Sequence, residues 1–384
     1  MPSTRGGGPH AMRLTRSFWP LAIIGLLVAA VPAQADDMAD CDDDSDADRT
    51  IAACTAVIQR NPSDSIAFYN RSAAYLKKGQ RDRAIEDYTT AIRLSPDDSL
   101  ALQKRGDLLK EKGLCDAAIA DYDNVLKISP RDTLALARRG DCHKILGNYQ
   151  RAIADYSEAL KFSPRFVAAL QGRAGAYRRS KNYDLALADF NAAIRINPEQ
   201  PRIFAERGFL HASRKNWDAA IADLSEALKR EPGLSGAFAV RGVAYSNKRE
   251  PAKAIADLSE AIRLSPRNSF AFHHRGIVHR RLKQFESALA DQTEALRLRP
   301  NFADAYNSRG NVWRDKQDLA KAVEDYSAAI RLQPQTILYL NARGFAYEKL
   351  NDREKAIADF RAVVAIDPND ATATQALQRL SRKR

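Results

Sequence analysis

The stretch "AIADYSEALKFSP" (Ala152–Pro164) recurs along the chain with small changes, and its spacing decides the fold. Its last residue is one of ten prolines that stand 34 residues apart without an insertion: Pro62, Pro96, Pro130, Pro164, Pro198, Pro232, Pro266, Pro300, Pro334 and Pro368. A fixed period of this length is typical of a stack of similar supersecondary units. If each repeat begins three residues after a proline, nine complete repeats follow: 65–98, 99–132, 133–166, 167–200, 201–234, 235–268, 269–302, 303–336 and 337–370.

Each repeat carries two apolar stripes with helical spacing. Position 20 is Ala in all nine repeats, position 8 is small, and positions 4 and 24 are large and apolar, except for Gln292 at position 24. Positions 4, 8 and 11 form one stripe, and positions 20, 21, 24, 27 and 28 form another. Turn residues such as "KKGQ" lie between the stripes, and the terminal proline ends the second helix. Each repeat is therefore predicted to be a helical hairpin.

The small residue at position 8, the Ala at 20 and the Pro at 32 resemble the tetratricopeptide repeat (TPR) family over residues 65–370. The resemblance implies an all-α fold, a right-handed superhelical solenoid whose first helices line a concave face where partners bind. Such arrays need capped ends. Residues 49–64 match an N-terminal half-repeat with only a second helix, and residues 371–384 match a C-terminal capping helix.

Two charged positions depart from the general TPR pattern, which prefers bulky apolar or aromatic residues there. Position 7 is always Arg and position 23 is always Asp, giving the pairs Arg71/Asp87, Arg105/Asp121, Arg139/Asp155, Arg173/Asp189, Arg207/Asp223, Arg241/Asp257, Arg275/Asp291, Arg309/Asp325 and Arg343/Asp359. At ~100° per residue, both positions lie on the same side of the antiparallel hairpin. We expect a structural ladder of bidentate Arg–Asp pairs at the edge of the buried seam, formed within one repeat or with its neighbour.

Residues 1–35 are predicted to be a secretory signal peptide. They combine a positively charged start, an apolar run over residues 18–31 and a small-x-small motif before Asp36. The run is shorter than the ~20 residues of a spanning helix, so a membrane anchor is the weaker alternative and we expect no stable span after cleavage. The expected location is periplasmic or secreted. Whether translation starts at Met1 or Met12 stays open.

The positive charge persists after the signal peptide is removed. Three of the 60 basic residues lie in residues 1–35, so the exported chain would carry 57 basic and 48 acidic residues, a formal net charge of +9. Export makes nucleic acid an unsuitable partner. An acidic protein, an anionic glycan or a membrane surface fits the charge better.

Four cysteines and an acidic segment follow the signal peptide. An even number of cysteines in an exported protein favours two disulfides, and proximity favours Cys41–Cys54 and Cys115–Cys142, although the pairing is not determined. Residues 36–48 hold eight Asp and are expected to be a disordered acidic leader. The sharper hypothesis is that this leader folds over the nearest basic cluster and competes with an anionic partner. It lacks the spaced acids and central Gly of a calcium loop.

No motif for catalysis, cofactor binding or metal binding is present. The chain has no P-loop, H-E-x-x-H, G-x-S-x-G or C-x-x-C motif. His143, His211 and His279 share position 11 but lie two repeats apart, too far for shared metal ligation. We therefore predict a protein that is not an enzyme, with no catalytic residue, no metal and no cofactor.

The partner-binding residues are expected at the concave positions 2, 5, 9, 12 and 13, which the TPR resemblance assigns. These hold two basic clusters and four aromatic anchors: Lys110, Lys144, Arg178, Arg179, Arg280, Arg281 and Arg314, with Tyr69, Phe209, Phe270 and Phe345. The alternative is a solvated edge of mixed charge. The Lys and Asn of a chaperone-type carboxylate clamp are missing.

The function expected from these residues is a protein-interaction scaffold or adaptor in the cell envelope that binds a protein or peptide in its groove. The alternative is a binder of an anionic envelope glycan or lipid headgroup through the basic clusters. No motif in the sequence identifies the partner or the oligomeric state.

Overall fold

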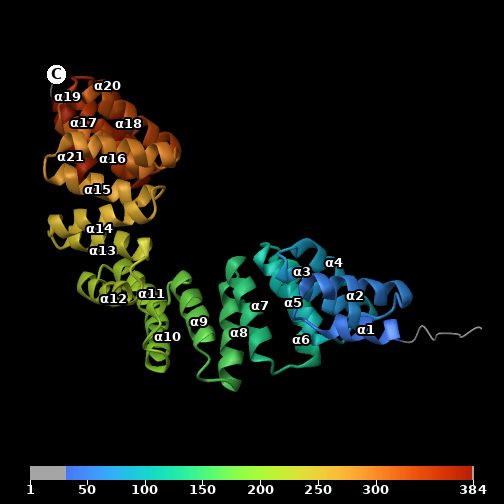
Figure 1. Ribbon diagram of the computed structural model, residues 1–384. Coiled ribbons are helices and arrows are strands. Elements are labelled where there is room, and N and C mark those ends of the chain that lie inside the picture. Colours follow the sequence, from blue (N-terminus) through green and yellow to red (C-terminus); the bar gives the residue numbers. More distant parts are fainter. Residues whose placement is uncertain (1–31, 383–384) are drawn as a thin grey trace, which may run out of the picture. The chain divides into compact units, whose positions relative to one another are not determined.

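The computed structural model describes residues 32–382, which contain only helices (Figure 1). Most of the predicted signal peptide, residues 1–31, lies outside the described residues. The chain divides into two compact parts, residues 1–108 and 109–384. No helix in residues 32–382 is both long and apolar enough to cross a membrane.

Each repeat is a pair of helices in the register that the sequence predicts. The first helices occupy positions 1 to 13 and are α3 (Ser65–Lys77), α5 (Ser99–Glu111), α7 (Thr133–Ile145), α9 (Val167–Arg179), α11 (Pro201–Ser213), α13 (Ser235–Asn247), α15 (Ser269–Arg281), α17 (Ala303–Asp315) and α19 (Ile337–Lys349). The second helices occupy positions 17 to 30 and are α4 (Arg81–Leu94), α6 (Cys115–Ile128), α8 (Tyr149–Phe162), α10 (Tyr183–Ile196), α12 (Trp217–Arg230), α14 (Pro251–Leu264), α16 (Phe285–Leu298), α18 (Leu319–Leu332) and α20 (Arg353–Ile366). The fold is a TPR-type solenoid in which consecutive helices pack in pairs.

The two helices of a hairpin approach closely because small residues face large ones across the seam. The Ala at position 20 is completely buried in every repeat, from Ala84 to Ala356. In repeat 8, a Cβ atom added to Gly310 would lie 2.7 Å from the ring of Tyr326, the buried residue at position 24. Because interiors are close-packed, a side chain at position 8 and a large ring at position 24 compete for the same space.

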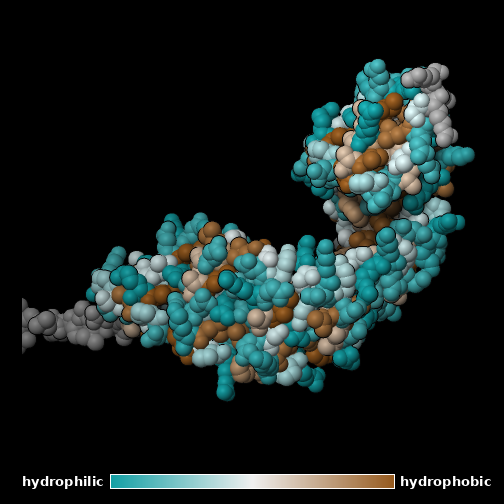
Figure 2. All heavy atoms as spheres, turned by 180° about the vertical axis from the view of Figure 1, so that it is seen from behind, coloured by the Kyte–Doolittle hydropathy of each residue, from teal (hydrophilic) through white to brown (hydrophobic). Residues whose placement is uncertain are grey.

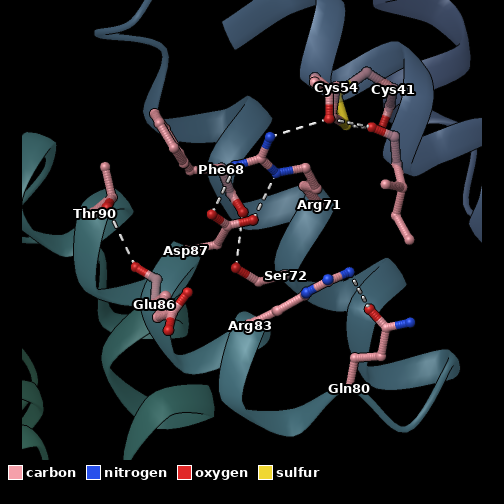
Figure 3. A network of polar contacts seen from close by, with 12 residues as sticks. Cys41, Cys54, Phe68, Arg71, Ser72, Gln80, Arg83, Glu86, Asp87 and Thr90 are labelled. Atoms are coloured by element: carbon pink, nitrogen blue, oxygen red, sulfur yellow. Dashed lines mark hydrogen bonds and ion pairs between the residues drawn. A yellow bond between two sulfur atoms is a disulfide. The ribbon is translucent and has the colours of Figure 1, made fainter.

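The Arg at position 7 and the Asp at position 23 meet as a bidentate pair in eight repeats. The Arg Nε lies 2.7–3.0 Å from one carboxylate oxygen, and Nη2 lies 2.6–2.9 Å from the other. Figure 3 shows Arg71 and Asp87 in repeat 1. The ninth pair, Arg105 and Asp121, has one residue in each compact part of the chain.

The acids of these pairs lie deeper than the edge position that the helical wheel predicts. In the eight complete pairs each Asp is only 5–7% exposed: Asp87, Asp155, Asp189, Asp223, Asp257, Asp291, Asp325 and Asp359. A wheel describes one hairpin alone, so it does not show that the next hairpin covers the edge. None of these eight carboxylates is therefore available to a ligand, and their role is structural.

The same guanidinium also reaches the preceding repeat. Its Nη1 donates a hydrogen bond of 2.6–3.3 Å to position 25 of the previous second helix, where the acceptor is Thr55, Thr89, Asp123, Ser157, Asn191, Ser225, Ser259, Thr293 or Ser327. Each such Arg therefore connects neighbouring repeats. The sequence left open whether the Arg binds within its own repeat or to its neighbour; within the eight complete pairs it does both.

The N-terminal segment differs from the expected disordered leader and half-repeat. Residues of the acidic segment form helix α1 (Pro32–Asp42), which packs against α2 (Ala47–Arg60) as a further hairpin in the same register. The sulfur atoms of Cys41 and Cys54 lie 2.07 Å apart, at bonding distance, and both residues are buried. The prediction of disorder was wrong because it considered only the electrostatic repulsion among the Asp side chains and not their contacts with neighbouring helices.

Local partners neutralise those acids. Asp37 pairs with Arg60, Asp40 with Arg49, Asp44 with Lys77 and Asp48 with Lys78, Asp42 accepts a hydrogen bond from Asn70, and Asp46 caps α2. The acidic segment is therefore held on α2 and α3 and is not a free arm.

The second predicted disulfide is absent from the structure. Cys115 and Cys142 are buried free thiols in one apolar cluster. Burial, together with a hydrogen bond to Cys115, raises the pKa of Cys142 to about 12. The thiol form is therefore stable, because only the thiolate reacts readily. The spacing along the chain correctly predicted that Cys115 and Cys142 are neighbours, but the disulfide predicted between them is not formed.

The C-terminal segment forms α21 (Ala371–Arg382), which packs against α20. Leu377 and the buried Ala373, Ala376 and Leu380 contact the apolar cluster of repeat 9. Arg379 forms an ion pair with Glu348 of α19, at 2.7 Å. This helix covers the apolar end of the last repeat.

Replacing Asp189 with Ala is expected to lower the free energy of unfolding by roughly 3 kcal/mol, because Arg173 is then left without a counter-ion in a largely buried place. Replacing both Arg173 and Asp189 with Leu should recover most of that loss. Urea unfolding followed by circular dichroism measures both, with the exposed Asp116→Ala on α6 as the control. An unchanged midpoint for Asp189→Ala would contradict a structural role of the pair.

Candidate functional site

A groove of about 670 Å³ opens over the first helices of repeats 3, 4 and 5. Its lining comes mainly from α7, α9 and α11, with Tyr149 of α8, and includes Asp141, Lys144, Gly172, Gly175, Arg178 and Glu206. Three of the predicted partner-binding residues, Lys144, Arg178 and Arg179, line this groove. The volume lies in the range of ligand-binding clefts, ~300–1,000 Å³.

The floor of the groove is formed where α9 lacks side chains. Gly172 occupies position 6 and Gly175 position 9, and no other repeat has Gly at either position. Gly172 is needed for packing, since an added Cβ would lie 2.4 Å from the ring of Tyr156. At Gly175 an added Cβ would meet only the Lys144 side chain, at 3.9 Å. Gly172 therefore accommodates the ring below, while Gly175 leaves the groove open.

Asp141 organises one wall. Its Oδ1 accepts a hydrogen bond of 2.6 Å from the Tyr156 hydroxyl and one of 3.0 Å from Lys144 Nζ. Lys110 Nζ lies 3.8 Å from its Oδ2. Burial, and next the Asp141 carboxylate, raise the pKa of Tyr156 well above its usual value of 10. Tyr156 therefore acts as a fixed donor, and Lys144 is held against both the acid and the ring.

The opposite wall has less complete pairing. Arg178 Nη2 lies 3.4 Å from Glu206 Oε2, while Arg178 Nε is buried and lacks a hydrogen-bond partner in residues 32–382. The side chains of Arg179 and Arg202 are exposed, and Arg202 Nε lies 3.9 Å from Glu231. This wall can accept further anionic groups.

Comparison with known proteins identifies the repeats. Residues 65–98, 133–166, 173–242, 236–268, 271–302 and 337–370 match the family described as "Tetratricopeptide repeat", and residues 310–351 match "TPR repeat". The chain belongs to the tetratricopeptide repeat family. TPR arrays are a common scaffold for contacts between proteins.

Solved TPR structures share the fold. A tetratricopeptide repeat protein from Parabacteroides merdae is 21% identical, with a TM-score of 0.54 over 66% of this chain and 99% of that chain. A chain of the APC/C hetero-tetramer Cut9–Hcn1 is 17% identical, with a TM-score of 0.57 over 87% of this chain and 67% of that chain. No curated protein matches the sequence. These likenesses show the fold and leave the partner of this TPR chain open.

The second predicted basic cluster is more fully neutralised. Arg280 and Arg314 both bind Asp315, at 3.1 and 3.2 Å. Arg281 donates to the carbonyl and hydroxyl oxygens of Ser246 and lines a separate cavity of about 510 Å³ at the ends of α13 and α15. All three cations of this cluster are therefore engaged within the chain, two of them by Asp315 and one by Ser246.

The predicted aromatic anchors are mostly used for packing. Tyr69 packs edge-on against Tyr88, Phe345 against Phe360, and Phe209 lies half-buried in the cluster of repeat 5. Phe270 is 40% exposed and rests on the ring of His274. Only Phe270 presents much of its ring to solvent.

Position 11 histidines lie beside the structural ladder. Nε2 of His143, His211 and His279 is 3.8–3.9 Å from the buried carboxylate of the same repeat, which belongs to Asp155, Asp223 and Asp291 respectively. Burial lowers the pKa of His143 and His211 below 6.5. No group of three or more His, Cys, Asp or Glu in residues 32–382 is arranged to hold a metal ion.

Sequence reasoning missed two features of the concave surface. The Gly pair of repeat 4 was visible in the aligned repeats, but it was not treated as a signal. Besides the predicted Phe270, position 2 carries exposed apolar side chains in several repeats: Ile66 and Leu100 in the first part, and Leu134 and Leu338 in the second. Figure 2 shows hydrophobic patches separated by hydrophilic surface on the side that it presents.

Substituting the two glycines with Ala should give effects of opposite sign. Gly172→Ala forces the buried Tyr156 ring to shift and should cost about 1–3 kcal/mol. Gly175→Ala has room and should stabilise α9 by roughly 0.5–1 kcal/mol, because Gly is a poor helix former. Urea unfolding of the two variants checks this. Equal effects of the two changes would refute the packing assigned to Gly172.

Proposed function

We propose that this protein is an exported, non-enzymatic scaffold or adaptor of the cell envelope that binds a protein or peptide segment in the groove over α7, α9 and α11. The observation that carries the proposal is the groove itself: a hollow on the first-helix face with a Gly floor and charged walls. A rigid stack of hairpins supports it, so a partner meets a surface that is already formed. Preformed surfaces bind with a smaller ordering cost.

The charged groups of the groove are arranged for binding. Asp141 is occupied by Tyr156 and Lys144, and Glu206 faces Arg178. A general acid or base needs a proton position open to the substrate and a pKa near the working pH. The paired carboxylates of this groove instead fix the positions of their cations, which supports a non-catalytic role.

A binder of an anionic envelope glycan or lipid headgroup is the second candidate. The exposed Arg179 and Arg202 favour it, because they offer cations to any anionic ligand. The acids on both walls disfavour it, because a ligand with a negative charge at every position would place some of these charges against Asp141 and Glu206. A groove of mixed charge suits a peptide, whose side chains differ from one position to the next.

Export is supported by the predicted signal peptide and by the Cys41–Cys54 contact, because disulfides persist in oxidising compartments. If the precursor is exported, mass spectrometry of protein purified from the periplasm without reduction should find Asp36 as the first residue. The same spectra should find Cys41 linked to Cys54. An intact N-terminus on the recovered protein would contradict the proposal of export.

Filling the groove should remove partner binding without loss of the fold. Position 9 is Phe in repeats 5 and 9, so Gly175→Phe places there a side chain that this repeat accommodates. We expect crosslinked partners captured by the native chain to be lost with Gly175→Phe. The matched control, Val243→Phe at position 9 of α13, should keep them. Equal capture by both variants would place the partner elsewhere on the solenoid.

A further inference from the structure

We infer that the groove over α7, α9 and α11 takes an extended acidic segment of a partner protein, with its carboxylates on Arg178, Arg179 and Arg202. This inference rests on the proposed function and narrows the chemistry of the partner. It is carried by the charge balance of the groove, by an unsatisfied donor in its wall and by the shape of its floor.

The groove has a surplus of cations. Lys144, Arg178, Arg179 and Arg202 line it against two acids, Asp141 and Glu206. Asp141 already receives Tyr156 and Lys144, and Lys110 lies 3.8 Å away. Asp141 therefore has its cations, while Arg179 and Arg202 remain exposed at the last turn of α9 and the first turn of α11, where Arg202 Nε has only a 3.9 Å contact with Glu231. A peptide with acids near both ends of the groove would meet a cation at each end.

Arg178 supplies the specific element. It makes one contact of 3.4 Å with Glu206, which is long for a charge-assisted hydrogen bond, and its buried Nε has no acceptor in residues 32–382. A buried donor without a partner costs free energy. A carboxylate entering the groove beside α9 would give the Arg178 guanidinium a closer partner than Glu206.

The floor fits an extended backbone. Gly175 carries no side chain, and an added Cβ there would meet only Lys144, so a peptide can lie close to α9 at this point. Three neighbouring first helices span roughly 20 Å at ~10 Å per helix, which is about six residues of extended chain. Gln171 on the same face adds an amide that can bond to a peptide backbone.

The chain's own acidic segment is already engaged elsewhere. Asp37, Asp40, Asp44 and Asp48 form ion pairs with Arg60, Arg49, Lys77 and Lys78 of α2 and α3. The hypothesis that this leader competes for a basic cluster therefore loses its basis, since the leader's charges are used within the N-terminal hairpin and repeat 1. The occupant of the groove must come from another protein.

The test is selection of a random peptide library, displayed on phage, against the full-length mature chain. The selected peptides should be rich in Asp and Glu, and a fluorescein-labelled copy should bind with an affinity that falls as salt is raised. Arg178→Gln should weaken its binding about tenfold, because it removes a charge-assisted hydrogen bond worth about 1.4 kcal/mol. Glu206→Gln should strengthen binding about two- to fivefold, because it removes the competing carboxylate.

The matched control is the other basic cluster. Arg280→Gln with Arg314→Gln should leave the affinity of the labelled peptide unchanged, and circular dichroism should show that every variant is folded. A merely structural role of Arg178 cannot produce tighter binding on loss of Glu206, so that gain separates recognition from stability. Failure of both Arg178→Gln and Glu206→Gln to change affinity would overturn the inference.

Other outcomes separate the inference from the proposed function. Selection of apolar or basic peptides whose binding is lost with Gly175→Phe would overturn the acidic ligand and leave the peptide groove standing. Peptides that bind the native chain and Gly175→Phe equally would overturn both. Both would also be overturned if no peptide is selected while phosphatidylglycerol vesicles or a sulfated polysaccharide bind the native chain and do not bind Gly175→Phe.

Discussion

The Arg at position 7 is the residue on which the stack depends, because its guanidinium holds three helices at once. Nε and Nη2 bind the Asp on the second helix of the same repeat, and Nη1 binds position 25 of the previous second helix. A rigid planar fork matches a carboxylate and leaves one donor pointing sideways, which the point charge of Lys would not do. The interaction thus sets both the closure of a hairpin and its register on the preceding one.

Much of this arrangement was predictable from residue spacing. A helical wheel places positions 7 and 23 on the same side of an antiparallel hairpin, and the structure brings Arg173 onto Asp189. The contact with position 25 could not be predicted from an invariant residue, because the acceptor at that position is Thr, Ser, Asn or Asp in different repeats. These side chains have in common only an oxygen atom that accepts a hydrogen bond at a similar distance from the backbone. A search for identical residues overlooks such chemical equivalence.

The N-terminal hairpin shows a different limit of sequence reasoning. Eight Asp in residues 36–48 suggest mutual repulsion when the segment is considered alone. The structure pairs four of them with cations of α2 and of the end of α3, and each exposed pair contributes little by itself. Together with buried Cys41, they hold α1 on α2. Whether like charges repel or are paired depends on tertiary neighbours, which composition does not contain.

The groove was predicted in part, for an instructive reason. Lys144, Arg178 and Arg179 were identified because the family resemblance assigns their positions to the concave face. The hollow between them depends on the side chain that is missing at Gly175, and a search for chemical groups does not detect a missing side chain. The aromatic anchors failed in the opposite way, because Tyr69 and Phe345 had partners within the core. Exposure, which decides between these cases, follows from packing.

The groove-facing residues of a first helix can differ between repeats because the Arg that joins the repeats lies on another face of the same helix. On α9, Arg173 forms the contacts that join repeats, and its neighbour Gly172 lies about 100° around the helix axis. Changes at positions 2, 5, 9 and 12 therefore leave the Arg contacts intact, and the groove differs from repeat to repeat while the stack does not. The pattern changes at α21, where position 7 is Leu377, and position 25 of α20 is Arg361, which is not an acceptor. The Arg contact that joins each repeat to the one before it therefore has no counterpart between α20 and α21.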